Sequence, residues 1–254
     1  MLVDTHCHLY LLGASAEELV AEAGAAGVGH LVDVGIDLAS SEVAAANAAR
    51  IPAVSATAGI HPNSATEATP TALAALEVLL ARPEVVAAGE TGLDNYRDHT
   101  PPEVQRRAFA THAELARRFD KALVIHCRDA FDDVLEVLDR AGAPERVVFH
   151  CFTGSAAMAK RIVEAGWVVS FSGTVTFRNA PDQRAACAVV PLDQLVLETD
   201  SPFLSPHPYR GQPNRPGRVA VTAATVAEVH GIDLDAVAKA TTATAARTFR
   251  LPLA

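Results

Sequence analysis

Two histidines separated by one residue, His6 and His8, are the first side chains in the chain that suggest chemistry. They stand in a short apolar segment, 2–9, with the pattern of a strand. Because alternate residues of a strand point to the same side, both imidazoles can reach one ion. Neutral imidazole suits zinc, iron or manganese. A single histidine at a strand end is usually a hydrogen-bonded structural residue, so the prediction of a metal site rests on the pair.

Further histidines and carboxylates stand at the ends of later apolar runs: His61, Glu90, His126, His150 and Asp200. Burying an unpaired carboxylate is costly, so the two acids are expected to pair or to bind metal. A carboxylate can also bridge two ions, and two ions about 3.5–4 Å apart can activate a water for attack. Glu90 is the candidate bridge. Glu198 precedes Asp200 by two residues and is interpreted as a polar core residue.

Short Val, Ile and Leu runs supply the strands that must position these residues, and alanine-rich helical patterns separate them. The predicted strands are 2–9, 30–35, 54–61, 85–93, 122–127, 146–152, 167–174 and 195–200. The predicted helices are 15–27, 70–81, 102–119, 129–141 and 155–165, with two closing helices in 216–247 split near Gly231. N-caps are predicted at Thr69, Asp129 and Ser155.

Eight strand–helix units in about 250 residues match an α/β fold, the (β/α)8 TIM barrel. An open doubly wound sheet is the alternative, although it normally has fewer strands and a clear switch point. The absence of a linker-like composition change predicts a single domain, 1–254. In a barrel the carboxyl ends of the strands meet on one face, so the histidines and carboxylates are predicted to form one pocket.

The cysteines are interpreted as structural. Cys7, Cys127 and Cys151 each adjoin a candidate histidine ligand, and no CxxC pair occurs. Strand alternation would turn their thiols away from the ligands and towards the helices, where cysteine behaves as a small buried hydrophobe. Cys187 has no predicted partner.

Composition limits the function classes. Half the residues are hydrophobic, which permits a large core, and the formal net charge is −9. This charge argues against a passive nucleic-acid binder. It leaves open an enzyme that acts on nucleic acid, because cations and a few arginines can neutralise a phosphate locally. No signal peptide and no apolar span of roughly 18 residues is evident. The expected protein is cytoplasmic, away from membranes and without a stable protein partner.

Six motifs together resemble the TatD family of metal-dependent deoxyribonucleases, within the amidohydrolase-like barrels. The resemblance covers residues 3 to about 251, and its motifs lie at 4–9, 59–62, 89–94, 125–130, 150–154 and 198–202. Two departures lie outside the proposed metal site. Ala122 stands where the family often has proline, and Thr244 replaces an asparagine near the C-terminus.

The resemblance implies two divalent ions, zinc, magnesium, manganese or iron, bound to six residues. His6, His8, Glu90 and Asp200 would bind one ion, and Glu90, His126 and His150 the other. His61 would contact a phosphate oxygen of the substrate. Arg128 and Arg210 would lie near the scissile phosphate or the pocket rim, although an ordinary surface role for them is equally open. His99 is interpreted as an exposed loop residue.

The activity that the resemblance implies is 3'-5' exonucleolytic hydrolysis of single-stranded DNA. Glu90, His61 and Asp200 would be catalytic, with Asp200 accepting the proton of the attacking water. One alternative is a metal-dependent amidohydrolase, lactonase or phosphotriesterase. Such barrels often place a carboxylated lysine on the fourth strand, where this chain has Glu90, while Lys121 precedes the fifth. A non-catalytic metal-binding barrel is the other alternative, and the complete set of ligands argues against it.

Overall fold

Parallel strands alternate with helices along almost the whole chain. The computed structural model describes residues 1–253, so Ala254, the last residue of the predicted domain, lies outside the described residues. The strands are β1 (Leu2–Cys7), β2 (Val28–Val34), β3 (Val54–Ala58), β4 (Val85–Asp94), β5 (Ala122–Arg128), β6 (Val147–Phe149), β7 (Val168–Phe171) and β8 (Leu195–Leu197). Their order in the sheet follows the chain from β1 to β8, and a parallel bridge joins Cys7 to Ser201, just after β8. This is the strand order of a (β/α)8 barrel, which confirms the predicted fold class.

Each predicted helix occurs in the structure, with its ends shifted by a few residues at most. They are α1 (Ala16–Ala25), α2 (Leu38–Arg50), α3 (Pro70–Leu80), α4 (Pro102–Arg118), α5 (Phe131–Ala141), α6 (Ala156–Glu164), α7 (Pro181–Val189), α8 (Val219–His230) and α9 (Leu234–Phe249). Short 3-10 helices are η1 (Leu9–Leu11), η2 (Pro62–Glu67), η3 (Gly173–Thr176), η4 (Leu192–Gln194) and η5 (Pro216–Arg218). None of the helices among the described residues has both the length and the apolar character needed to cross a bilayer.

Helix caps explain where the prediction succeeded and where it failed. Thr69 and Ser155 cap α3 and α6 as predicted, each accepting a backbone N–H three residues on. The predicted cap at Asp129 is wrong: Ala130 precedes α5, and Asp129 has a φ of 52°, outside the extended conformation of an N-cap. Helices α2 and α7 were not predicted, although Asp37 forms a capping box at the start of α2.

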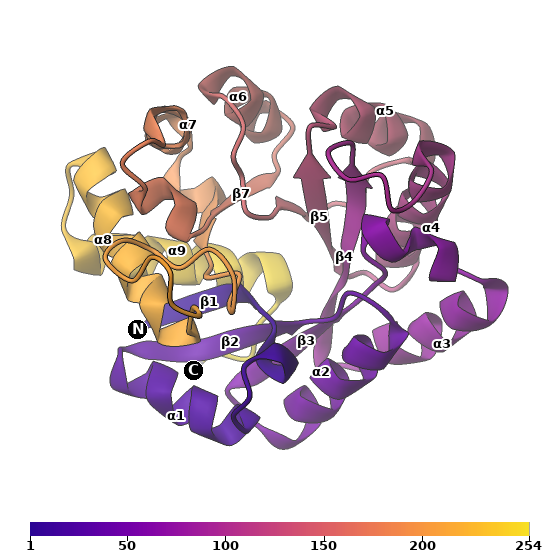
Figure 1. Cartoon of the computed structure of the whole chain (residues 1–254), viewed down its shortest axis with the longest axis horizontal. Helices are drawn as coiled ribbons and strands as arrows, with labels where there is room; N and C mark the ends of the chain where they lie inside the picture. The colour runs from indigo at the N-terminus through magenta and orange to yellow at the C-terminus, as the bar shows by residue number, and fades with distance from the viewer. Residues whose placement is uncertain (254) are drawn as a thin grey trace. The chain divides into compact units, whose positions relative to one another are not determined.

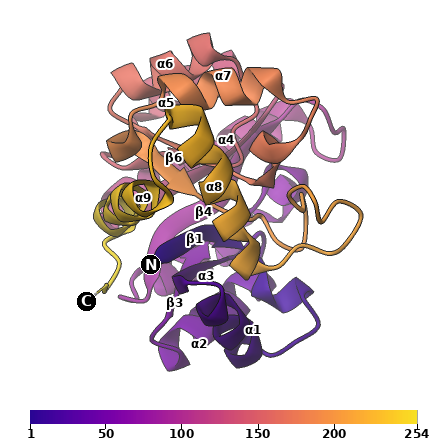
Figure 2. The same ribbon diagram turned by 90° about the vertical axis from the view of Figure 1, so that its left-hand side faces the viewer.

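The chain divides into two compact units, of which the first comprises 1–33 and 151–254. Within it β1 pairs with β2 and β7 pairs with β8, all in parallel. Helices α8 and α9 pack against each other and against β1, as Figures 1 and 2 show. Because every residue of β1 is buried, its His6 lies in the interior of this unit.

The second unit, 34–150, contains β3 to β6. Adjacent strands β3, β4, β5 and β6 pair in parallel. Helices α2 and α3 cover β3, and α4 lies along β4 (Figure 1). All of β4 and the first four residues of β5 are buried, and the continuous apolar pattern of 122–125 predicts this burial for β5.

Several strands end earlier than predicted, and these include three that precede candidate site residues. β3 stops at Ala58, β6 stops at Phe149 and β8 stops at Leu197. His150 and Asp200 therefore lie in the loops that follow their strands. Positive φ angles at Cys151 (44°) and Asp200 (55°) end the extended conformation there, so strand alternation no longer sets side-chain direction.

Candidate metal centres

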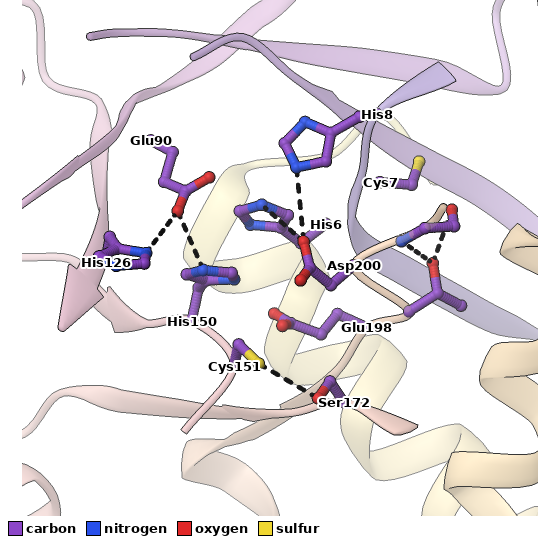
Figure 3. Close-up of polar contacts among 12 residues, drawn as sticks. His6, Cys7, His8, Glu90, His126, His150, Cys151, Ser172, Glu198 and Asp200 are labelled. Atoms are coloured by element: carbon purple, nitrogen blue, oxygen red, sulfur yellow. Dashed lines mark hydrogen bonds and ion pairs between the residues drawn. The ribbon is translucent and has the colours of Figure 1, made fainter. Parts of the chain in front are cut away.

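Three predicted ligands meet in the first unit, and we call them the His6 cluster: His6, His8 and Asp200. Their ligand atoms all lie within 4.8 Å of one another. Oδ1 of Asp200 is 3.4 Å from Nε2 of His8 and 3.8 Å from Nε2 of His6, and Figure 3 shows both rings directed at this carboxylate. Two imidazoles and one carboxylate form a donor set that suits a divalent transition metal.

Backbone pairing between β1 and the segment after β8 positions this cluster. The N–H of Asp200 donates to the carbonyl of His6 at 2.8 Å, and the N–H of His8 donates to the carbonyl of Ser201 at 2.8 Å. The buried carboxylate of Asp4 accepts both the N–H (2.9 Å) and the hydroxyl (2.6 Å) of Thr199. Burial raises the pKa of Asp4 to about 8, although these hydrogen bonds oppose the shift. The His6 cluster is thus held by hydrogen bonds that join β1 and the residue following it to the segment after β8.

Four more predicted residues meet in the second unit around one oxygen, and we call them the Glu90 cluster: His61, Glu90, His126 and His150. Oε1 of Glu90 is 2.9 Å from Nδ1 of His126, 3.1 Å from Nε2 of His150 and 3.4 Å from Nε2 of His61. Figure 3 shows His126 and His150 on either side of this carboxylate. Burial by itself would raise the pKa of Glu90, but the neighbouring histidines outweigh it and hold the pKa well below its usual value. Glu90 is therefore ionised.

A close approach of β4 to β5 brings Glu90 to His126. Gly92 pairs with His126 across the two strands and has a φ of 138°. A Cβ at this position would lie 2.0 Å from the carbonyl oxygen of His126. Only glycine fits both the conformation and the contact. The register of β4 against β5 beside Glu90 consequently depends on glycine at position 92.

His61, Glu90 and His126 also form a group whose ligand atoms all lie within 4.8 Å of one another, but His61 differs from the other histidines in its local hydrogen bonding. It caps η2, and its Nδ1 accepts the N–H of Asn63 at 3.1 Å. Burial lowers the pKa of His61 to about 4, so the ring is neutral at pH 7. A neutral ring whose Nδ1 is an acceptor carries its proton on Nε2. Nε2, which lies 3.4 Å from Oε1 of Glu90 and 3.2 Å from Nδ1 of His126, is then a hydrogen-bond donor.

Asp94, for which the sequence pattern predicted no role, lies beside the Glu90 cluster. It is 1% exposed, and its Oδ2 lies 3.1 Å from Nε2 of His126, on the opposite side of the ring from Glu90. Strand alternation contained a signal for it, because residues four apart on β4 face the same way. Asp94 is therefore on the Glu90 side of the strand, within reach of the same histidine.

The two arginines predicted to bind substrate each lie over an aromatic ring. The guanidinium of Arg128 lies 3.9 Å from the ring centre of Tyr96, and that of Arg210 lies 4.0 Å from the ring centre of Phe177. Both arginines are exposed, as is His99. Glu198 is fully buried and accepts the hydroxyl of Ser170, consistent with the interpretation of a polar core residue.

The cysteines are thiols outside these clusters. Burial raises the pKa of both Cys127 and Cys187 to about 12, and the ligand groups found among residues 1–253 contain no cysteine. The expectation that strand alternation orients Cys151 is wrong. Cys151 lies in the turn after β6, and its Sγ is 3.3 Å from Oγ of Ser172 (Figure 3). The thiol of Cys7 donates to the carbonyl of Val32 on the adjacent strand.

Comparison with known proteins gives one consistent result. The model of the family described as TatD related DNase matches residues 3–250. A metal-dependent hydrolase named TatD from Mycobacterium tuberculosis is 44% identical, with 98% of each chain covered. A metal-dependent hydrolase from Bacillus subtilis is 38% identical over 99% of this chain and 100% of its own. The crystal structure of a TatD homologue from Escherichia coli matches with a TM-score of 0.93 and 31% identity, covering 99% of this chain and 98% of that one.

Proposed function

We propose, because this chain belongs to the TatD related DNase family of metal-dependent hydrolases, that it hydrolyses phosphodiester bonds from the 3' end of single-stranded DNA. The observation that best supports this proposal is the Glu90 cluster. There an ionised, buried carboxylate lies within 3.4 Å of three imidazoles. A buried carboxylate with this many imidazole neighbours is typical of a divalent-metal site.

Each cluster fits one divalent ion. His6, His8 and Asp200 would hold one, and Glu90, His126 and His150 would hold another. A bound ion would lower the pKa of a coordinated water and neutralise charge on the phosphate. That Glu90 also binds the ion of the His6 cluster remains a prediction from the sequence. Mixed imidazole and carboxylate donors admit zinc, manganese, iron or magnesium.

Asp200 and His61 would act on the reacting groups. The side chain of Asp200 is 14% exposed, so its carboxylate can reach a water and accept its proton as general base. The Asn63 hydrogen bond keeps the proton of His61 on Nε2. This N–H would donate a hydrogen bond to a phosphate oxygen. Because burial keeps the ring neutral, its contribution is a directed hydrogen bond without a positive charge.

Exposed aromatic side chains favour a single-stranded substrate. Phe203 is 51% exposed, and its ring lies edge-on to His8 with 6.0 Å between the ring centres. Bases of a single strand can stack on such rings, whereas those of a duplex are already stacked. The formal charge of −9 also suits binding of a strand end better than enclosure of a long duplex. We therefore propose that Arg128 and Arg210 contact the strand locally.

Hydrolysis of labelled oligonucleotides tests the proposal. Metal-free protein should be inactive and should regain activity on addition of zinc, manganese or magnesium. A label at the 5' end should report stepwise shortening if degradation starts at the 3' end. Glu90→Ala and Asp200→Ala should each abolish activity, whereas Asp132→Ala, on the exposed surface of α5, should not.

The alternatives give different results in the same experiment. A small-substrate hydrolase would cleave lactones, amides or phosphotriesters while leaving DNA intact. A non-catalytic barrel would bind metal and hydrolyse none of them. Full metal-dependent DNase activity in either the Glu90→Ala or the Asp200→Ala variant would contradict the roles assigned to them.

A further inference from the structure

Asp94 is buried at the end of β4, and both of its carboxylate oxygens have hydrogen-bond partners. Oδ1 accepts the backbone N–H groups of Tyr96 (3.0 Å) and Arg97 (2.9 Å). Oδ2 lies 3.1 Å from Nε2 of His126 and 3.4 Å from Nδ2 of Asn63. The two oxygens therefore have different partners, since one binds the loop backbone and the other faces the imidazole.

The backbone of Asp94 is held as firmly as its side chain. Its N–H donates to Oε1 of Gln105 at 2.8 Å, and Nε2 of Gln105 donates to the carbonyls of Thr100 (2.9 Å) and Asp94 (3.3 Å). Gln105 comes from α4 and is 1% exposed. A side chain anchored in this way cannot rotate away from His126 without breaking several buried hydrogen bonds.

His126 lies between two carboxylates, with Nε2 towards Asp94 and Nδ1 towards Glu90 at 2.9 Å. An imidazole binds an ion only through an unprotonated nitrogen, so one nitrogen must keep the proton. The Tyr96 and Arg97 N–H groups hold Oδ1 of Asp94, and this leaves Oδ2 directed at Nε2 of His126. Asp94 is thus a permanent acceptor on the Nε2 side.

We infer that Asp94 is a positioning residue, which keeps the proton of His126 on Nε2 and thereby directs the Nδ1 lone pair to the ion of the Glu90 cluster. The inference rests on the proposed function, in which His126 is a metal ligand. Carboxylates that accept the second N–H of a ligating histidine orient the ring and increase its basicity. A carboxylate that only braced the loop would leave metal affinity and tautomer unaffected.

Asp94→Asn separates the two roles. In this variant the backbone N–H groups of Tyr96 and Arg97 still need an acceptor, so the side-chain oxygen stays at the Oδ1 position. The side-chain NH2 then takes the Oδ2 position and faces Nε2 of His126. A donor there favours the tautomer with the proton on Nδ1, the wrong one for metal binding. We expect the affinity of the Glu90 cluster for zinc, measured by calorimetry, to fall about 10–100-fold. The ion of the His6 cluster should bind as in the wild type.

Asp98→Asn is the matched control. It makes the same change of charge in the same loop, on an exposed side chain, and should leave both zinc affinities unchanged. Equal zinc affinity of Asp94→Asn and wild type at both sites would overturn the inference. A wild-type protein that binds no zinc, manganese or magnesium would instead contradict the proposed function.

The tautomer of His126 can also be observed directly in the wild-type protein. Long-range proton–nitrogen NMR of the zinc-bound protein should show a proton on Nε2 and none on Nδ1. His126→Gln identifies the signal by its loss. A ring that keeps its proton on Nδ1 in the presence of zinc would overturn the inference, even if Asp94→Asn failed to fold.

Discussion

Nε2 of His112 accepts the backbone N–H of Ile60 at 3.0 Å, immediately before His61. On its other side, Nδ1 of His112 donates to the carbonyl of Ala108 at 2.8 Å. The ring is fully buried, and burial lowers its pKa, so it stays neutral. A neutral histidine on α4 therefore links this helix to the backbone that positions His61.

Replacing this histidine tests the link. His112→Leu leaves the Ile60 N–H and the Ala108 carbonyl without their partner, and should lower the free energy of unfolding by about 1–3 kcal/mol. Denaturant titration measures the loss, and His99→Leu, in an exposed loop, is the control. Equal stability of the two variants would show that the bond to Ile60 is dispensable.

Gly92→Ala should disrupt the Glu90 cluster. The added Cβ would meet the carbonyl oxygen of His126 at 2.0 Å, so β4 and β5 must separate. We expect a lower melting temperature and weaker zinc binding at this cluster. Gly211→Ala is the matched control, since Gly211 also has a positive φ (84°) but its Cβ would meet nothing within 4 Å. If both variants lose the same stability and retain zinc affinity, φ strain alone is responsible.

Phe203→Ala should weaken binding of single-stranded DNA. Stacking of a base on an aromatic ring contributes about 1–3 kcal/mol, so KM should rise about 5-fold to 150-fold. The value of kcat should change little, because the ring is not among the predicted ligands or proton donors. Fluorescence anisotropy of a labelled oligonucleotide provides a direct check. Val78→Ala, which removes an apolar side chain 64% exposed on α3, should bind as the wild type does.

Acid should destabilise the fold through His30. Burial lowers the pKa of His30 from 6.5 to about 4. Between these two values the unfolded chain binds a proton that the folded protein does not, so stability falls as the pH falls through this window. For a shift of this size the full loss is about 3 kcal/mol. His30→Gln should reduce the slope of unfolding free energy against pH between those values, and an unchanged slope would contradict the prediction.

Divalent ions should stabilise the folded protein. A ligand that binds only the folded state adds about 2.7 kcal/mol when present at roughly 100 times its Kd. Chelation should therefore lower the melting temperature, and added zinc should restore it. The double variant His8→Ala/Glu90→Ala should respond to neither treatment. An equal response of the wild type and the double variant would place the stabilising ions elsewhere.

Much of the site was predictable because its signals are local. His6 and His8 alternate on a strand, and Glu90 and Asp200 are carboxylates in apolar surroundings, where an unpaired charge is costly. The alternation of apolar runs and helical patterns likewise predicted the fold class. The missed helix α2 had a cap signal in Asp37, but its small-residue composition lacks a strong apolar period.

The sequence by itself determined which residue types end the strands, and hence the donor chemistry of both clusters, because these depend on local pattern and side-chain identity. Only the tertiary structure decided which ring nitrogen of His61 and of His126 carries the proton and which has a lone pair. The Asp94 carboxylate beside His126 comes from another strand, and the folded conformation of the turn after His61 brings the Asn63 N–H to its ring. Proton position depends on these contacts in space, and a linear pattern of residues does not specify them.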